Sequence, residues 1–408
     1  RARRSLLGSL VVLALVILSA VLLRFGGDNT DMSAVVPRRE ELYRRSGEAG
    51  DEPSPWPSAN SPVASATVER PCFELPGRDR IMNWSFFLPP VETAIASGPL
   101  QADVQRDFAA RERRCECLVQ EPFKLCAKGV GASFNSALKP FTEAYIDSFP
   151  FVISSSDGPV ESLGVLSPAP AECTLPGARL NAGVPPCKGG IADENSCKHP
   201  EESRSARVPP AFEHRGFFWW TAQQWAWLLR PSAVFARSLA SEKERLNWEA
   251  RRPIMGIHVR HGDSCSPKEE KRTARRCEGL EVYMRAVGKM VAYGYRSIYL
   301  ATDDAAMVKK APNLALGYEL MYSLPSQAQK RTRGGQFERI RKTINITREY
   351  QEVLMDILLL ADADGLVGKF TSNVFRIAYA LSYGRRGCAL PFVSLDSFWC
   401  SDFGKRTG

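Results

Sequence analysis

Several ionisable side chains crowd the end of one apolar segment of this sequence. Residues 253–265 read PIMGIHVRHGDSC, in which the chemistry-bearing side chains are His258, Arg260, His261 and Asp263. A guanidinium fixed at such a position can hold a phosphate group through two parallel hydrogen bonds. A plainer interpretation is that Arg260 and Asp263 form an ion pair that only holds the turn. Gly262, between them, would allow close backbone approach or a positive φ.

Two further stretches place polar side chains directly after apolar ones. LATDD puts Asp303 and Asp304 after a predicted strand, and GKFTSNVFR puts Thr371 and Ser372 just before a predicted helix. Hydroxyls at a helix start leave backbone amides able to meet an anion. Plain helix capping is the alternative for these hydroxyls, and also for Asp303. We favour a ligand site because all these groups converge on one edge.

The elements that must position these residues follow from the periodicity after Gly216. A helix is expected from Phe217 up to Pro231, and helices and strands then alternate, which predicts an α/β fold with a parallel, doubly wound sheet. Ligands of such sheets bind at the carboxyl ends of the strands. The expected strands are 254–259, 297–302, 318–323, 365–368 and 390–395. The expected helices are 280–293, 305–311, 348–361 and 372–381.

The first residues have the pattern of a membrane anchor. Residues 1–4 carry three arginines, and residues 5–23 are nineteen residues without a charge, enough for a single transmembrane helix. The positive-inside rule leaves residues 1–4 cytosolic and the rest lumenal, a type II topology. A cleaved signal peptide is less favoured because the apolar run exceeds a usual h-region and no small-residue cleavage site closes it.

Composition divides the rest of the chain. Residues 24–70 are rich in Ser, Pro, Gly and charge, which predicts a disordered stem. We expect an N-terminal lobe at 71–215, with a helix at 133–146 and a strand ending near residue 154, a donor-binding lobe at 216–395 and a C-terminal tail at 396–408. Residues 156–210 give no clear pattern.

Eleven cysteines fit an oxidising, lumenal compartment. We expect Cys265 to pair with Cys277 and Cys388 with Cys400, although spacing alone does not fix connectivity. The formal net charge of +9 comes from scattered basic residues without interleaved aromatics, so a nucleic-acid partner is not expected, whereas a small anionic substrate is compatible.

Four blocks in order resemble the α-1,6-fucosyltransferase family, which fucosylates the innermost N-acetylglucosamine of N-glycans. They are GFFWWTAQQWAWLLRP, IMGIHVRHGDS, SIYLATDD and DILLLADADGLVGKFTSNVFRIAYAL, and GVGASFNSALKPFTEAYIDSFPFVIS resembles a further segment more weakly. The resemblance extends more distantly to Nod-factor and protein O-fucosyltransferases. It implies a GT-B-like, two-lobed, inverting enzyme that uses GDP-β-L-fucose and needs no metal.

The resemblance also assigns roles. Arg260 matches a phosphate-binding arginine that stabilises the leaving group. Asp263 matches an acidic position of the same site, and Glu269 is the candidate base. The expected donor-binding residues are His258, Arg260, Asp304, Asp356, Thr371 and Ser372, with His258 and Asp356 against the guanine.

The sequence departs from the family pattern at two positions. His261 stands where the family has a second arginine, and Lys268 stands where it has the base, so that Glu269 or Glu270 must serve in a shifted register. Glu269 in an exposed, solvated loop is the alternative. No coiled-coil heptads follow the stem and the sequence shows no SH3-like segment, which leaves the acceptor open.

The expected function is fucosyl transfer to N-glycan cores in the Golgi membrane, with a chitin-like oligosaccharide or protein Ser/Thr as other acceptors. A metal-dependent GT-A enzyme using Asp362 and Asp364 is one rival, and an inactive lumenal sugar-binding homologue is another. The sequence does not predict an oligomeric state.

Overall fold

The computed structural model describes residues 72–75, 84–95, 102–112, 130–135, 137–146, 208–262, 265, 276–315, 317–323 and 346–400. All of them belong to one compact unit, residues 58–408. The expected anchor, the stem, the strand near residue 154, Asp263 and Glu269 lie outside the described residues. Within the described ranges, no helix combines the length and apolar character needed to cross a bilayer.

The core is a six-stranded sheet in the order β1-β6-β5-β2-β3-β4. Its strands are β1 (Phe86–Phe87), β2 (Ile254–Val259), β3 (Ser297–Thr302), β4 (Glu319–Met321), β5 (Gly365–Gly368) and β6 (Phe392–Ser394). Five strands run parallel, as expected, but β1 pairs antiparallel with β6. The sheet is therefore mixed. Strand β1 was not predicted because its two residues are too few to give a periodic signal in the sequence.

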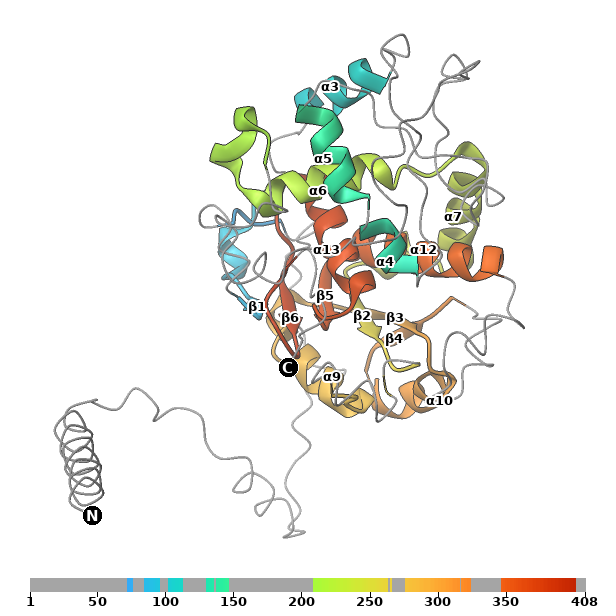
Figure 1. Ribbon diagram of the computed structural model, residues 1–408. Coiled ribbons are helices and arrows are strands. Elements are labelled where there is room, and N and C mark those ends of the chain that lie inside the picture. Colours follow the sequence, from blue (N-terminus) through green and yellow to red (C-terminus); the bar gives the residue numbers. More distant parts are fainter. Residues whose placement is uncertain are drawn as a thin grey trace, which may run out of the picture. The chain divides into compact units, whose positions relative to one another are not determined.

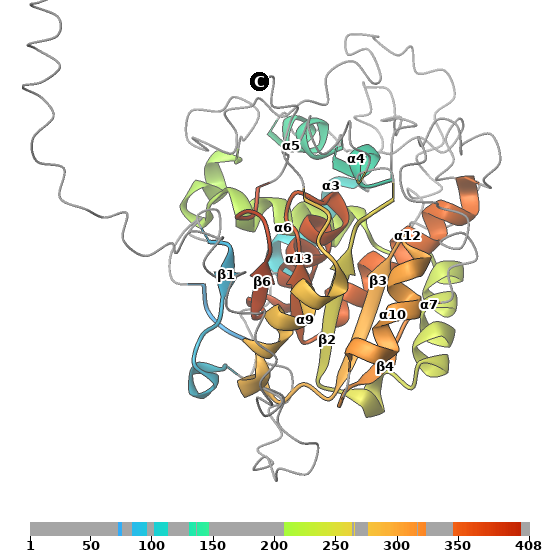
Figure 2. The same cartoon turned by 90° about the horizontal axis from the view of Figure 1, so that it is seen from below.

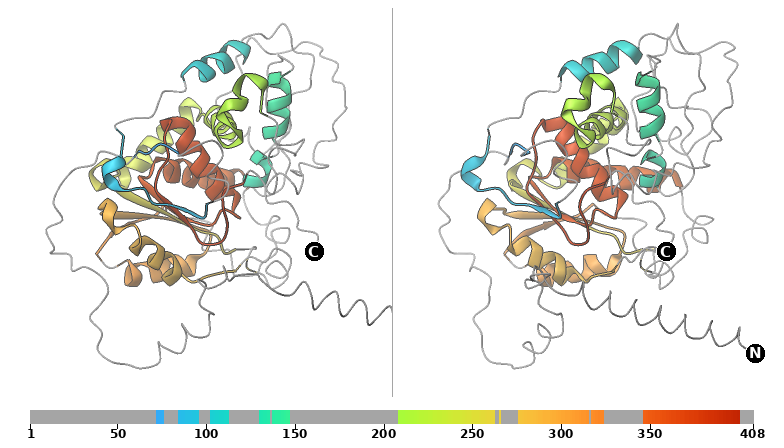
Figure 3. Two further views of the ribbon diagram at one scale, coloured as in Figure 1. Left: turned by 90° about the vertical axis from the view of Figure 1, so that its left-hand side faces the viewer. Right: turned by 60° about the vertical axis from the view of Figure 1, so that its left-hand side comes forward.

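Helices cover both faces of the sheet (Figures 1, 2 and 3). On β2, Met255 and Ile257 belong to the core shared with α9 (Leu280–Gly288) and α10 (Ala305–Leu314). Ile254 faces the opposite core, formed with α6 (Phe217–Leu228), α12 (Ile346–Asp362) and α13 (Asn373–Arg386). Successive strand side chains point to opposite faces, so an all-buried β2 requires a helical layer on each side. The doubly wound arrangement is confirmed.

One helical prediction was wrong, and one helix was missed. The helix expected over 133–146 is two helices, α4 (Val130–Asn135) and α5 (Leu138–Ile146). Pro140 explains the break, because proline has no N–H for an interior helical bond but is tolerated in the first turn of α5. The helix α7 (Ala233–Arg245) was not predicted. Its N-cap is Ser232, whose hydroxyl accepts from the Phe235 amide at 3.1 Å. Phe235 is the one residue of α7 that is buried, so no apolar stripe indicates this helix in the sequence.

The remaining short elements complete the described chain. They are α3 (Ala102–Glu112) and the 3-10 helices η2 (Val91–Thr93), η6 (Pro210–Arg215), η7 (Glu249–Arg251) and η9 (Val291–Tyr293). The expected helix 280–293 is thus α9 followed by η9. The helices α3 and α5 pack on α6, and α4 packs on α13. The described parts of 71–215 therefore join the sheet in one unit, and the lobe boundary at 215/216 stays a prediction.

A disulfide fastens the N-terminal part to the end of α13. Cys72 pairs with Cys388 across 316 residues, next to backbone hydrogen bonds between Phe73 and Ala389. The prediction of a Cys388 to Cys400 bond was therefore wrong, although Cys400 is also disulfide-bonded. Spacing favoured the nearby cysteine, whereas the actual partner is brought in by the fold. The predicted bond between Cys265 and Cys277 is confirmed.

A buried ionic cluster lies where β2 and β5 begin. The Arg252 guanidinium donates to Asp364 and to Asp362, each at 2.7 Å, and Asp364 also accepts from the Ile254 amide at 2.8 Å. Lys243 and the Trp248 indole also donate to Asp362. These aspartates are held by donors at the amino ends of the strands, away from the crevice edge, which removes the basis for a GT-A metal site there.

We predict that Asp364→Asn destabilises the fold. Asp364 is 0% exposed, so its loss leaves the charge of Arg252 partly uncompensated, and the free energy of unfolding should fall by about 3–5 kcal/mol. Urea unfolding followed by circular dichroism measures the change. The matched control is Glu249→Gln, because Glu249 also pairs with Arg252 but its side chain is 64% exposed, and it should cost less than about 1 kcal/mol. Equal costs would contradict this account.

Candidate active site

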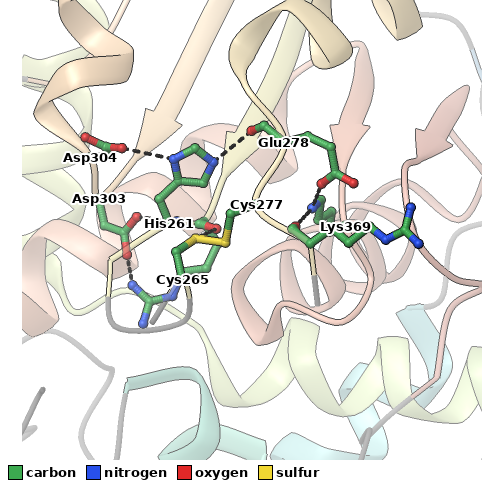
Figure 4. The surroundings of a disulfide bond; sticks show 9 residues. His261, Cys265, Cys277, Glu278, Asp303, Asp304 and Lys369 are labelled. Carbon is green, nitrogen blue, oxygen red and sulfur yellow. Dashed lines mark hydrogen bonds and ion pairs between the residues drawn. A yellow bond between two sulfur atoms is a disulfide. The ribbon is translucent and has the colours of Figure 1, made fainter. Parts of the chain in front are cut away.

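Paired charges line the carboxyl ends of β2 and β3. The register aligns Val259 with Thr302, so the two residues after β2 meet the two residues after β3. Arg260 forms an ion pair with Asp303, whose Oδ1 also accepts from the His261 amide at 2.8 Å. The His261 ring contacts Asp304 at 2.9 Å (Figure 4). Each of the two residues after β2 thus faces one carboxylate after β3.

Asp303 and Asp304 have different roles, and the helix cap is not the aspartate that was considered for it. Asp304 caps α10, because its Oδ1 accepts from the Ala306 amide at 2.8 Å and its Oδ2 contacts His261. Asp303, for which capping was the alternative, instead pairs with Arg260. The helix cap is thus Asp304 and the partner of Arg260 is Asp303. Because the two aspartates are adjacent, sequence spacing alone could not assign these two roles.

Gly262 leaves space for the ion pair between Arg260 and Asp303. A Cβ at this position would overlap the Asp303 carboxylate and lie 2.9 Å from Arg260 Nη1. Its φ is not in the left-handed region, so close approach, rather than a special backbone conformation, explains this glycine.

His258 lies at the same strand end but in an apolar setting. Its ring stacks on Phe375 of α13 at 6.3 Å between centroids, and within the described chain its Nδ1 has no hydrogen-bond partner. Burial, and then the charge of Arg260, lowers the pKa of His258 to about 3. The ring is therefore neutral at physiological pH. Both the ring and its Nδ1 are buried, and the expected contact of His258 with guanine stays a prediction.

Lys369 joins the site from the end of β5, and the sequence interpretation missed it. Its ammonium donates to the Arg276 carbonyl and to the Glu278 carboxylate, and the Glu278 carbonyl lies 2.8 Å from Nε2 of His261. The neighbouring Cys277 is bonded to Cys265 (Figure 4). The available signal was a lysine directly after the buried strand GLVG, since lysine is rarely buried without a partner.

The start of α13 lies at the edge formed by β5 and β6. Thr371 donates to the Asp396 carboxylate, so its hydroxyl is engaged by the protein. Ser372 is the N-cap of α13 but makes no side-chain capping bond, which removes the capping alternative for this residue. From α4, Asn135 donates to Asn373 Oδ1 at 3.1 Å, and Gly131 packs against Asn373. The weakly matching glycine-rich segment thus reaches the helix start that follows Ser372.

Asp356 contacts the body of the sheet. Its carboxylate accepts from the Tyr299 hydroxyl at 2.6 Å, and Tyr299 pairs with Gly256, two positions before His258. Burial, and then the neighbouring Asp356 charge, raises the pKa of Tyr299 well above its usual value. The structure thus assigns Asp356 a hydrogen bond within the fold, and its expected contact with guanine stays a prediction.

Taken together, the edge gathers Arg260, His261, Asp303, Asp304 and Lys369 from three strand ends. In the part of the chain that the structure describes, no three His, Cys, Asp or Glu residues are grouped to hold a metal ion. Fixed cations at the carboxyl edge of a doubly wound sheet are typical of domains that bind phosphorylated ligands.

Comparison with known proteins finds similarity to one family of glycosyltransferases over under half of the chain. Residues 210–399 match the model of the alpha-(1,6)-fucosyltransferase N- and catalytic domains. The alpha-(1,6)-fucosyltransferase of Drosophila melanogaster is 30% identical over 197 residues, which are 44% of this chain and 28% of that protein. Residues 210–399 are thus similar to alpha-(1,6)-fucosyltransferases, as the sequence blocks indicated, and the chain spans under a third of that relative's length.

Solved structures give two further similarities. The fucosyltransferase NodZ from Bradyrhizobium is 19% identical with a TM-score of 0.25, over 37% of this chain and 42% of NodZ. POFUT1 in complex with GDP-fucose is 12% identical with a TM-score of 0.28, over 42% of this chain and 48% of POFUT1.

We predict that neutral His258 makes the fold sensitive to mild acid. The folded ring stays neutral, whereas the unfolded chain binds a proton below about pH 6.5, so the free energy of unfolding should fall as pH drops towards 3. This residue should contribute up to about 1.4 kcal/mol per pH unit. Urea midpoints between pH 6.5 and 5 measure the slope, and His258→Phe, which keeps an aromatic ring against Phe375, should flatten it. An unchanged slope would show that the ring is not held neutral.

Proposed function

We propose that this protein transfers L-fucose from GDP-β-L-fucose to a hydroxyl of a glycan, with inversion at the sugar. The observation that carries the proposal is Arg260, fixed by Asp303 at the crevice edge within the segment that matches the alpha-(1,6)-fucosyltransferase catalytic domains. The donor is also the ligand named for the similar POFUT1 structure.

The chemistry explains the need for a fixed cation. The acceptor oxygen forms a bond to C1 of fucose while the bond from C1 to the β-phosphate oxygen breaks, and the electron pair leaves with GDP. Negative charge therefore grows on the diphosphate as the sugar becomes oxocarbenium-like. An arginine already oriented by a carboxylate stabilises that charge without reorganisation. The side chain of Arg260 is 27% exposed, so solvent and ligand can reach it.

A base must also remove the acceptor proton. We assign this role to Glu269, with Glu270 as the other candidate. Both lie in the segment between Cys265 and Cys277, and the disulfide keeps the two ends of that segment at the charged edge. The acidic Asp263, two residues before Cys265, is assigned to the same site.

The proposed acceptor is the innermost N-acetylglucosamine of N-glycans, in α-1,6 linkage. The name of the Drosophila relative supports the α-1,6 linkage, and a chitin-like oligosaccharide or a protein hydroxyl are the other acceptors to test. The apolar run at residues 5–23 supports a type II anchor in the Golgi membrane with a lumenal catalytic domain. Donor binding is proposed to involve Ser372 and the start of α13, where helix amides favour an anion.

Arg260→Ala should reduce fucosyl transfer by a factor of about 100 or more, because the main cation at the leaving group is lost. A glycan array with GDP-[14C]fucose measures transfer, and circular dichroism checks the fold. Arg237→Ala is the matched control, since Arg237 is an exposed residue of α7, and it should retain full activity. Full activity in Arg260→Ala would sink the assignment.

The same assay separates the rival functions. Wild-type protein that binds GDP but transfers fucose to no glycan would be the inactive sugar-binding homologue. Transfer abolished by EDTA and restored by a divalent cation would indicate a metal-dependent enzyme instead.

Glu269→Gln should lower kcat by about 100-fold while changing the affinity for GDP little, because a general base acts on the acceptor proton. Single-turnover transfer and GDP titration measure the two quantities. Glu270→Gln is the matched variant and should stay close to wild type. The opposite result would move the base to Glu270, and two active variants would exclude both.

A further inference from the structure

The His261 ring is held between two oxygen atoms. Nδ1 lies 2.9 Å from Oδ2 of Asp304, and Nε2 lies 2.8 Å from the backbone carbonyl oxygen of Glu278. The residue is 1% exposed, so water does not replace either partner. A backbone carbonyl only accepts hydrogen bonds, and so does an ionised carboxylate.

A neutral imidazole has one N–H donor and one lone pair, and therefore satisfies only one of these oxygens. The other would face a lone pair at hydrogen-bond distance in a buried site. We infer that His261 carries both ring protons and serves, as an imidazolium, to position Arg260 and to balance the charge of Asp304. This inference deepens the proposed function and rests on it for the link to catalysis.

The charge matters because of its neighbours. Arg260 and His261 after β2 face Asp303 and Asp304 after β3, so with a charged ring the two cations offset the two carboxylates. With a neutral ring, the partly buried Asp304 carboxylate would stay uncompensated beside the place proposed for a diphosphate. A nearby negative charge disfavours the binding of an anion.

The backbone of His261 also helps to position Arg260. The His261 amide donates to Asp303 Oδ1, and Asp303 holds Arg260, so a shift of the ring would move the carboxylate that orients the guanidinium. On the other side, His261 and Lys369 both bind the segment from Arg276 to Glu278. The ring thus connects the ends of β2 and β3 to the disulfide-bonded segment.

This role accounts for a departure from the family pattern. A histidine at the position of the second arginine keeps a cation with two divergent donors, and its shorter side chain suits the distance between Asp304 and the Glu278 carbonyl. His258, three residues earlier, provides the contrast, because it has no carboxylate partner among the described residues and stacks on Phe375.

The protonation is read directly by NMR of the histidine rings. The sequence has four histidines, so ¹⁵N-labelled rings can be assigned by substitution, and exposed His214 serves as an internal reference. In neutral buffer, both His261 nitrogens should show protonated shifts, whereas His258 should show one unprotonated nitrogen. An unprotonated Nδ1 in His261 would overturn the inference and place the shared proton on Asp304.

The functional part is tested by GDP titration of four proteins. His261→Gln keeps a donor for the Glu278 carbonyl but leaves the Asp304 charge unbalanced, so the Kd for GDP should rise about tenfold. His261→Gln with Asp304→Asn removes that charge while asparagine still caps α10, and the Kd should return to within about twofold of wild type. Asp304→Asn alone completes the cycle.

A purely structural role for His261 predicts a different pattern. The double variant would then bind GDP as poorly as His261→Gln, or worse, and the inference would be wrong. Failure of the proposed function is distinguishable, because a wild-type protein that binds no GDP leaves the ring spectrum readable. In that case the two ring protons would still confirm the imidazolium, and the catalytic link alone would fail.

Discussion

The pairing of β2 with β3 is the constraint on which the candidate site depends. Because the two strands run parallel and end together at Val259 and Thr302, their following residues face each other in order. The charges of Arg260 and His261 then meet those of Asp303 and Asp304 without further adjustment. A slip of one residue would offset these pairs and turn each side chain of β2 to the helical layer on the other face of the sheet. The register of β2 and β3 thus determines which charged side chains pair in the candidate site.

The two ends of the sheet use charge for different purposes. At the amino ends, Arg252 and Asp364 satisfy each other deep in the fold, and their partners are all parts of the protein. At the carboxyl ends, His261 and Lys369 are buried, whereas the side chain of Arg260 is partly accessible. The first arrangement fixes where β2 and β5 begin. The second leaves an arginine with 27% of its side chain accessible, where a ligand can compete for it.

Sequence patterns predicted the parts of the fold that depend on local periodicity. The apolar runs of β2, β3 and β5 marked these strands at their observed bounds, and Arg260 was correctly placed at the strand end. What failed depended on contacts between distant residues or on single atoms. Cys72 meets Cys388 only in the folded chain, and the choice between Asp303 and Asp304 as helix cap turns on one residue. Lys369 was overlooked because its partners come from another loop.

The bond between Cys265 and Cys277 has a consequence for how this protein can change over time. Both cysteines are fixed at the charged edge, so residues inserted or removed between them leave the flanking strand end and α9 where they are. Each added residue in such a closed segment costs little free energy. The number of residues that precede a carboxylate in this segment can therefore change without altering the register of the sheet. A one-residue insertion that places the base at Glu269, where the family pattern has it at the position of Lys268, is compatible with the fold.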